Sequence, residues 1–199
     1  MLNAPRRATG VSLIELMIAI AILTIVMAIG FPSFQVWMQN LQVRSGSESM
    51  LNGMEYAKQE AIKRNAPVTF TLSDGTGLSD WNVACAAPFS VGCPNAAILR
   101  SAVSAEGATN ARVGVNAIAA ALQNYAAALP VASNMPATIT FDSFGRVIGA
   151  ASFTRIDTQI LPAIAVAGAR RLVITITPGG ATRLCDPQFA LANNPQGCV

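Results

Sequence analysis

The pattern of apolar positions divides the chain into an N-terminal helical part and a C-terminal part of short β-like runs. Residues 11–31 form one apolar run whose single ionisable side chain is Glu15. At 1.5 Å per residue, a helix of this length spans about 31 Å, the thickness of the hydrocarbon core of a bilayer. The run therefore predicts a membrane-spanning helix.

A second helical pattern continues from residue 33 to residue 64. Its apolar residues recur at spacings of three and four, as an amphipathic helix requires. Gly30 and Pro32 predict a kink between the two patterns, because proline lacks an N–H and clashes with the preceding helical turn. Residues 44–47 interrupt the apolar seam and predict a second soft point, and Pro67 predicts the end of the helix. The seam consists of Phe34, Met38, Leu41, Leu51, Met54, Ala57 and Ala61.

The rest of the chain consists of short alternating or β-branched runs with turn residues between them, which predicts an antiparallel β domain. Its last two strands form a hairpin over residues 178–180, Pro-Gly-Gly. Residues 117–129 are alanine-rich and predict a short helix, since their apolar residues recur at helical spacing, with a local insertion or a surface loop as the alternative. The fold class is thus α+β, with one long helix packed on a β head. The predicted strands are 68–72, 81–85, 98–103, 112–115, 138–141, 146–148, 153–156, 172–177 and 182–185.

Composition narrows the functional classes. The chain has 199 residues, enough for one domain, and contains no histidine, which excludes His-dependent catalytic triads and His-containing zinc sites. Its carboxylates lack the paired spacing of general acid–base catalysis. The glycine-rich stretch after Asp74 lacks the lysine and following helix of a phosphate loop, and Asp74 and Asp80 lack EF-hand spacing. We therefore expect no enzyme, no catalytic residue, no metal site and no cofactor.

Four cysteines suggest disulfides, because none of them stands in a C-x-x-C pair that would indicate a metal or redox motif. Four cysteines allow three connectivities. We favour the two local pairs, Cys85–Cys93 and Cys185–Cys198, because each closes a short loop rich in turn residues. Such bridges stabilise a fold by roughly 2–4 kcal/mol each and imply an oxidising compartment. The alternative is four reduced cysteines that pack as small hydrophobic side chains.

Two arginines, Arg6 and Arg7, precede the apolar run, so the positive-inside rule places the N-terminus in the cytoplasm and the rest of the chain across the membrane. A cleaved secretory signal and a plain single-span anchor are the alternatives. A secretory signal has a shorter apolar region. A plain anchor gives no reason for Glu15, because a carboxylate at a helix centre costs roughly 2.5–3.5 kcal/mol on insertion scales.

Residues 10–16, Gly-Val-Ser-Leu-Ile-Glu-Leu, resemble the processing motif of type IV prepilins and type II secretion pseudopilins. The resemblance implies that a prepilin peptidase cuts after Gly10 and that Val11, where the family usually has Phe, becomes the methylated N-terminus. It also implies that Glu15 serves assembly. Cleavage creates a cationic amine in an apolar setting, and a carboxylate on a neighbouring helix offsets the cost of burying both charges.

Residues 56–65 and 68–70, together with the run 138–146, resemble the end of the long helix and two strand regions in the GspH/FimT group of minor pilins and pseudopilins. The resemblance implies the type IV pilin fold.

Three parts of the chain follow from these resemblances. Residues 1–10 form a cleaved leader, and residues 11–32 form a transmembrane and fibre-core helix. Residues 33–199 form a periplasmic head that includes the amphipathic second half of the helix.

For function, the resemblance implies a minor type IV pilin that is anchored in the inner membrane and then incorporated at or near the pilus tip, where it helps to initiate assembly. Its partners would be major and minor pilins, prepilin peptidase and the inner-membrane assembly platform. The C-terminal loop closed by Cys185 and Cys198 favours the pilus, because minor pilins carry such a loop more often than pseudopilins do. A minor pseudopilin of a type II secretion system and a DNA-binding minor pilin for natural transformation remain alternatives.

A role in DNA uptake would need a basic surface. Loss of the leader lowers the net charge from +3 to +1, with 11 basic and 10 acidic residues, which provides no global field for nucleic acid. DNA-binding FimT-type pilins carry Gly-Arg-x-Arg in the final hairpin, where residues 180–183 here are Gly-Ala-Thr-Arg. Arg170, Arg171 and Arg183 could form a small patch for phosphate contacts, and we expect binding at no more than non-specific strength.

Overall fold

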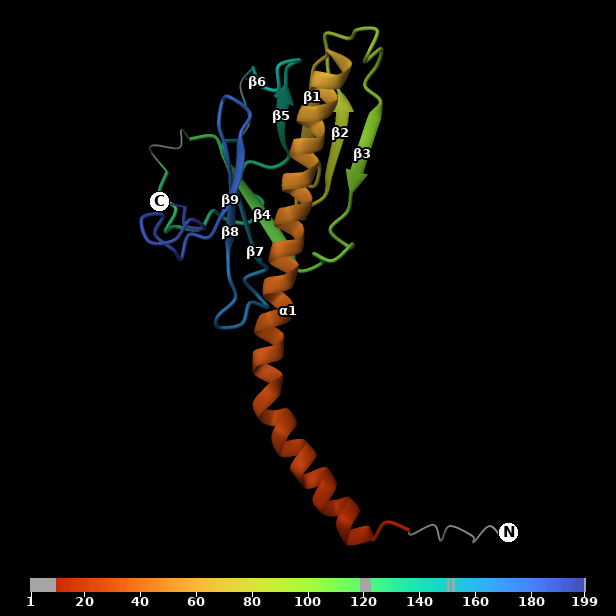
Figure 1. The fold of residues 1–199 in the computed structure, drawn as a ribbon, viewed down its shortest axis with the longest axis vertical. Helices are drawn as coiled ribbons and strands as arrows, with labels where there is room; N and C mark the ends of the chain where they lie inside the picture. Colours follow the sequence, from red (N-terminus) through yellow and green to blue (C-terminus); the bar gives the residue numbers. More distant parts are fainter. Residues whose placement is uncertain (1–9, 119–122, 150, 152, 199) are drawn as a thin grey trace, which may run out of the picture.

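A single long helix organises the molecule. The computed structural model describes residues 10–118, 123–149, 151 and 153–198. The helix, α1 (Leu13–Arg64), has 52 residues and carries the head on its C-terminal half. Its N-terminal part, residues 13–35, extends away from the head, and we call it the stem (Figure 1). The predicted α+β architecture, a long N-terminal helix with an antiparallel β head, is confirmed.

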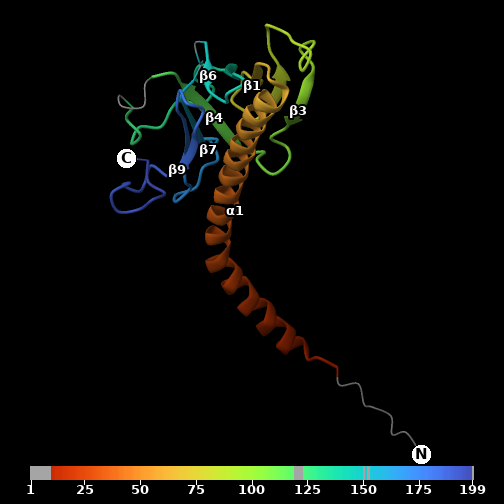
Figure 2. The same cartoon turned by 45° about the horizontal axis from the view of Figure 1, so that its top comes forward.

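The strands of the head form two antiparallel sheets. The strands are β1 (Val68–Leu72), β2 (Trp81–Cys85), β3 (Ile98–Ala102), β4 (Ala111–Asn116), β5 (Ala137–Phe141), β6 (Val147–Ile148), β7 (Arg155–Ile160), β8 (Leu172–Ile176) and β9 (Thr182–Cys185). The first sheet has the order β3-β2-β1-β5-β6 and the second the order β4-β7-β8-β9. In both views β3 lies on one side of α1, and β7 and β9 lie on the other (Figures 1 and 2).

The predicted strands are present with small shifts at their ends. The largest shift concerns β7, which was predicted at 153–156 and runs from Arg155 to Ile160. Phe153 is fully buried in the core just before this strand. The apolar run thus marks a buried segment correctly, but only part of it pairs with a neighbouring strand.

The head buries one stripe of α1 between its two sheets. Met50, Met54 and Ala57 are fully buried and pack with apolar residues of both sheets. Gly53 lies where the first sheet packs tightly on α1, because a Cβ at this position would stand 2.8 Å from Phe70 Cε2. A larger residue would separate helix and sheet, so glycine sets the depth to which α1 sinks into the head.

The apolar seam of the helix was predicted to begin at Phe34, and this part of the prediction is wrong. Phe34, Met38 and Leu41 are exposed, and the buried stripe starts at Val43 instead. The soft point predicted at 44–47 is also wrong, because α1 runs through these residues without a break. The small residues in this stretch allow the head to approach, and they do not loosen the helix.

The two ends of α1 follow local sequence signals. At the C-terminus Asn65 adopts a left-handed conformation, with φ of 49°, two residues before Pro67. Towards the other end, the parts Leu13–Ala28 and Gly30–Arg64 meet at a bend of 43°. Ala28 is the residue whose carbonyl the ring of Pro32 would meet in a regular helix, so the bend lies where this proline predicts it.

The bend also bears on the membrane-spanning prediction. Within the ranges that the structure describes, no single straight helix is both long and apolar enough to cross a membrane. The two parts of α1 on either side of the bend meet the requirement together, by length and composition.

The helix predicted at 117–129 is not found in the described residues of this stretch. Residues 123–129 form turns and irregular structure, and residues 119–122 lie outside the described ranges. The helical spacing of the apolar residues gave a wrong prediction for residues 123–129. Tyr125 is buried because a turn places it on the outer face of the second sheet, and no helix is needed for this.

The last turn of α1 contains an ion pair between residues four apart. Glu60 Oε2 accepts a hydrogen bond from Arg64 Nε at 2.6 Å, and this bond lowers the pKa of the Glu60 carboxyl from 4.5, although partial burial opposes the shift. A carboxyl with a lowered pKa in the folded state stabilises the fold above its unfolded pKa, and the contribution is lost as the pH falls through the folded value.

We predict that Glu60→Gln destabilises the head by about 1 kcal/mol at neutral pH, because the charged partner of Arg64 is lost. The difference in melting temperature between variant and parent should shrink as the pH falls below 4.5. Circular dichroism melts of the detergent-solubilised chain across a pH series measure it. A difference that stays constant down to acid pH would show that the carboxylate charge contributes nothing.

Candidate assembly interface

The stem presents apolar side chains to solvent around its whole circumference. Every side chain that the structure describes between residues 13 and 35 is exposed. Contiguous apolar surface of this extent marks a membrane or protein interaction site. The stem therefore requires an apolar environment that the described head does not provide. Its exposed large apolar residues are Leu13, Ile14, Leu16, Met17, Ile18, Ile20, Ile22, Leu23, Ile25, Val26, Met27, Phe31 and Phe34.

The residues predicted for processing and assembly lie together at the free end of the stem. Gly10 and Val11 are exposed and precede α1, so the peptide bond between them lies in a non-helical segment. Glu15 is the acidic residue of the first helical turn, where the helix macrodipole favours a negative charge. Within the described part of the chain Glu15 has no hydrogen-bond or ion-pair partner. The carboxylate is thus available to a cation from another molecule.

Head contacts with α1 begin directly after the stem. Gln39 donates from Nε2 to the carbonyl of Ile164 at 2.7 Å and accepts from the N–H of Val166 at 3.0 Å. Asn40 Oδ1 accepts from the N–H of Arg170 at 2.7 Å. These bonds fasten the β7–β8 loop to one side of the helix and mark where the head-bound part of α1 begins.

Both disulfides join the local pairs predicted from the sequence. Cys85 and Cys93 have a Cα–Cα distance of 5.5 Å and close part of the β2–β3 loop. Cys185 and Cys198 have a Cα–Cα distance of 5.0 Å and close the C-terminal loop. Each bridge therefore fixes one loop at the surface of the head.

The three arginines considered for DNA contact are directed at acceptors of the head itself. Arg170 lies 3.4 Å from a carboxylate oxygen of Asp186, and Arg171 pairs with the buried Asp157. Arg183 donates to two carbonyls of the C-terminal loop. Each of the three guanidinium groups therefore already has an acceptor within the head.

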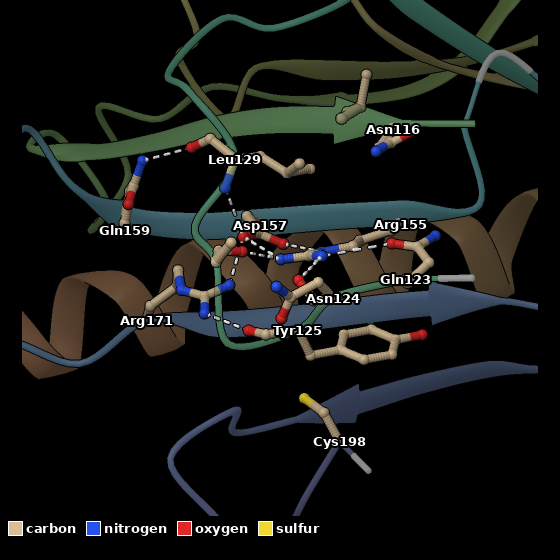
Figure 3. A network of polar contacts seen from close by, with 12 residues as sticks. Asn116, Gln123, Asn124, Tyr125, Leu129, Arg155, Asp157, Gln159, Arg171 and Cys198 are labelled. Atoms are coloured by element: carbon tan, nitrogen blue, oxygen red, sulfur yellow. Dashed lines mark hydrogen bonds and ion pairs between the residues drawn. The ribbon is translucent and has the colours of Figure 1, made fainter. Parts of the chain in front are cut away.

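A buried charge network crosses the outer face of the second sheet (Figure 3). Asp157 is fully buried, and Arg155, only 2% exposed, donates to both of its carboxylate oxygens at 2.5 and 2.8 Å. Arg171 donates to Asp157 Oδ2 at 2.5 Å, and the N–H of Leu129 donates to the same oxygen at 3.0 Å. One carboxylate therefore holds two arginines, which leaves an excess of one positive charge.

Backbone carbonyls of residues 124–127 accept hydrogen bonds from the two guanidinium groups and so help to compensate this excess charge. Arg155 donates to the carbonyls of Asn124 and Ala127 at 2.9 and 2.8 Å, and Arg171 donates to the carbonyl of Tyr125 at 2.5 Å. The Arg155 guanidinium also lies 5.0 Å from the centre of the Tyr125 ring. The network thus holds the 123–129 loop against the sheet.

Sequence reasoning missed this network, although a signal for it exists. Arg155 and Asp157 stand two residues apart in a strand, so their side chains share one face of the sheet. Two opposite charges on the same face of one strand indicate an ion pair within the sheet. The third member, Arg171, is 14 residues away from Asp157, and no local pattern connects the two.

A long apolar helix joined to an antiparallel β head, with a processing motif in front of it, defines a pilin-like subunit. The family model described as "Type II transport protein GspH" matches residues 47–180, and the model described as "Prokaryotic N-terminal methylation motif" matches residues 5–31. The first match covers more than half of the chain. The chain belongs to the GspH family of minor pilins and pseudopilins.

Two crystal structures of the type IV minor pilin FimU of Pseudomonas aeruginosa are similar to this chain. Both are 19% identical to it. One covers 78% of this chain and 99% of its own, with a TM-score of 0.43, and the other covers 79% and 95%, with a TM-score of 0.45. No curated protein matches the chain significantly.

We predict that Asp157→Asn costs about 3–5 kcal/mol of folding stability, because the buried Arg155 and the partly buried Arg171 lose their counter-charge while the side-chain volume is nearly unchanged. Chemical denaturation of the detergent-solubilised chain measures the loss. Glu48→Gln is the matched control, since its partner Arg44 and Glu48 itself are both exposed, and it should cost less than about 1 kcal/mol. Equal, small effects of the two substitutions would show that the buried network does not stabilise the head.

Proposed function

We propose that this protein is a minor type IV pilin that is inserted at or near the tip of the pilus and helps to initiate its assembly. The observation that carries the proposal is the exposed apolar stem with one unpartnered carboxylate, Glu15, in its first turn. A subunit of this shape completes its fold only beside other helices or in a membrane. Membership of the GspH family supports the same class of role.

Processing is the first step of the proposed function. Prepilin peptidase removes residues 1–10 by cleaving the bond after Gly10, and the new N-terminus at Val11 is methylated. Two observations support this step: the match of residues 5–31 to the N-terminal methylation motif, and the position of the Gly10–Val11 bond in an exposed segment before α1. An exposed, non-helical bond is accessible to a peptidase without unfolding of the helix.

Pairing between neighbouring stems is the second step. Cleavage leaves a cationic amine at Val11, four residues before a carboxylate in an apolar helix. Burial of either charge alone is costly, whereas an amine of one chain beside Glu15 of the next offsets both costs and fixes the register of the two stems. Glu15 is therefore an assembly residue and has no catalytic role, and the protein acts as a structural subunit.

Topology follows from the leader and the apolar stem. Arg6 and Arg7 keep the N-terminus in the cytoplasm, so the head with its two disulfides lies in the periplasm until export. The inner-membrane assembly platform and other pilins are the proposed partners of this state.

The alternative apparatus is a type II secretion system, in which the same subunit would be a minor pseudopilin. The family description names type II transport, and this observation keeps the alternative in place. A clean chromosomal deletion distinguishes the two. Loss of piliation and twitching with normal exoprotein secretion supports the pilin, and the opposite phenotype supports the pseudopilin. Loss of DNA uptake with intact pili would instead support a DNA receptor.

We predict that Gly10→Arg abolishes processing, because a long cationic side chain replaces the glycine at the cleavage position. Mass spectrometry of the N-terminus of membrane-extracted protein should find a chain starting at Val11 in the parent and an uncut leader in the variant. Wild-type cells with active peptidase in which the chain still begins at Met1 would contradict the prediction.

We predict that Glu15→Ala preserves membrane insertion, because the stem becomes more apolar, and lowers recovery in sheared fibres by about tenfold or more, because a neighbouring amine loses its partner. Immunoblots of membranes and fibres, normalised to the major subunit, measure both effects. Ser12→Ala is the matched control, since the Ser12 side chain makes no capping hydrogen bond. Normal recovery of the Glu15 variant would show that the charge pairing is not required.

A further inference from the structure

The β7–β8 loop, residues 161–169, is largely exposed although it carries no polar side chain. No polar or charged side chain occurs between Gln159 and Arg170. Residues 162–165 are all exposed, and Ile164 is 44% exposed. Surface loops consist mainly of polar and turn residues, so an exposed loop of this composition indicates an interaction site.

The loop lies at the end of the head nearest to the stem, beside α1 (Figure 1). Gln39 bonds to the carbonyl of Ile164 and to the N–H of Val166. A Cβ placed on Gly168 would lie 3.5 Å from Cγ1 of Val36. The loop is therefore held at the level of the helical turn that directly follows the stem.

Trp37 belongs to the same helical turn and is 55% exposed. The centre of its ring system lies 5.7 Å from the centre of the Phe34 ring. Among the described residues, none accepts a hydrogen bond from the Trp37 indole N–H. Tryptophan is enriched where membrane and water meet, because its ring is apolar while its N–H needs a polar partner. We call Trp37 together with residues 161–169 the basal surface.

The length of the stem places the basal surface at the level of lipid headgroups. At 1.5 Å per residue, residues 13–35 span about 34 Å along the helix, and the bend of 43° shortens this span along the membrane normal. The hydrocarbon core of a bilayer is about 30 Å thick, and the headgroup regions extend it to about 40–45 Å. When α1 begins at one edge of the core, the turn that carries Trp37 lies just outside the opposite edge.

Several main-chain groups of the loop are already bonded within the protein. The N–H groups of Ile164 and Ala169 donate to the carbonyls of Leu161 and Val166, each at 3.0 Å. Main-chain groups without a partner oppose contact with apolar surroundings, because they lose their water there. These two turns, together with the bonds to Gln39, lower the cost of bringing the loop to a lipid surface.

We propose that the basal surface docks on the periplasmic leaflet of the membrane that anchors the stem, with Trp37 and Ile164 among the lipid headgroups. The proposal rests on the proposed function, because it requires the stem to span the bilayer. Continuity supports lipid as the occupant, since the basal surface begins where the apolar stem ends. Tryptophan and aliphatic side chains bind the membrane interface in this way. The head therefore rests on the membrane before assembly, and a subunit that leaves the bilayer must break this contact.

A protein partner is the less suitable occupant. Four of the nine loop residues are alanine, a residue type that is depleted in protein interfaces. A fluid lipid surface accommodates such small side chains without matching their shape. Arg170, next to the loop, lies 3.4 Å from a carboxylate oxygen of Asp186 and is stacked on the ring of Phe189. We therefore expect the contact to be apolar and to need no anionic lipid.

Fluorescence quenching in reconstituted vesicles tests the proposal. The full-length chain carries a fluorescent amino acid in place of Ala165, an exposed loop position. It is inserted into phosphatidylcholine vesicles whose acyl chains are brominated close to the headgroups, since bromine quenches only a fluorophore in contact with the lipid. Quenching of about twofold or more is expected, because the loop lies at headgroup level. The same probe in place of Phe144, in the β5–β6 turn at the opposite end of the head, should not be quenched (Figure 1).

A charge substitution tests whether the apolar side chain carries the contact. Ile164→Glu should lower the quenching at residue 165 by about twofold or more, because a carboxylate resists transfer from water into the bilayer. Ile148→Glu is the matched control and should leave the quenching unchanged. Ile148 is 38% exposed, close to the value for Ile164, and lies in β6, away from the stem.

The outcomes separate this proposal from the proposed function. If the chain floats with the vesicles in a density gradient but the probe at residue 165 is not quenched, the lipid contact is rejected and the assignment as a membrane-anchored pilin stands. Quenching that Ile164→Glu does not change also rejects the lipid contact. A change in emission without quenching, which grows with the protein-to-lipid ratio, would show that a second copy covers the basal surface and would reject it as well. A chain that does not float with the vesicles rejects the membrane-anchored state of the proposed function together with the lipid contact.

Discussion

The burial of one helical stripe is the constraint on which the rest of the molecule depends. From Val43 to Ala61 the two sheets cover α1, and the apolar core of the head exists only because the helix lies between them. From residue 13 to residue 35 no described part of the chain covers the same helix. A continuous helix thus serves as a core element in one half and as an intermolecular surface in the other. Any force that a neighbouring molecule exerts on the stem therefore acts directly on the core of the head.

The two faces of the second sheet are buried by different kinds of contact. Towards α1 it is apolar, whereas its outer face carries the Arg155–Asp157–Arg171 network under the 123–129 loop. A buried ion group of this kind contributes less net stability than apolar packing of the same volume, because desolvation offsets the attraction. Its geometric demands are strict, since every donor needs an acceptor. The network therefore determines one position of the loop out of the many that an alanine-rich segment can adopt.

Local patterns predicted the elements of this fold well, and failed where tertiary contacts decide. Strands such as Val68–Leu72 and Trp81–Cys85 were predicted at their observed bounds, because alternation and turn residues are local properties. The apolar seam was misplaced at Phe34 and Leu41, since the sequence shows that a residue is apolar but not whether the head or another molecule covers it. The disulfide partners could be paired because a cysteine can bridge only to another cysteine, and four cysteines allow three connectivities. Arg171 and Asp157 are 14 residues apart, a separation similar to the 13 residues between Cys185 and Cys198. This ion pair was missed because an arginine has many candidate acceptors and the β7–β8 loop leaves no periodic signal.

The attachment of the β7–β8 loop to α1 has a consequence for how the family can vary. Gln39 and Asn40 bond only to main-chain groups of residues 164, 166 and 170, and Gln42 likewise accepts from the N–H of Asn110. Main-chain groups are the same whatever the side chain. Side-chain substitutions in these loops therefore leave the hydrogen bonds to the helix intact, provided that the loop backbone keeps its path and that Gln39, Asn40 and Gln42 are retained. The surface beside the stem can diversify among related subunits, and thus discriminate between neighbours, without altering the way the head is fastened.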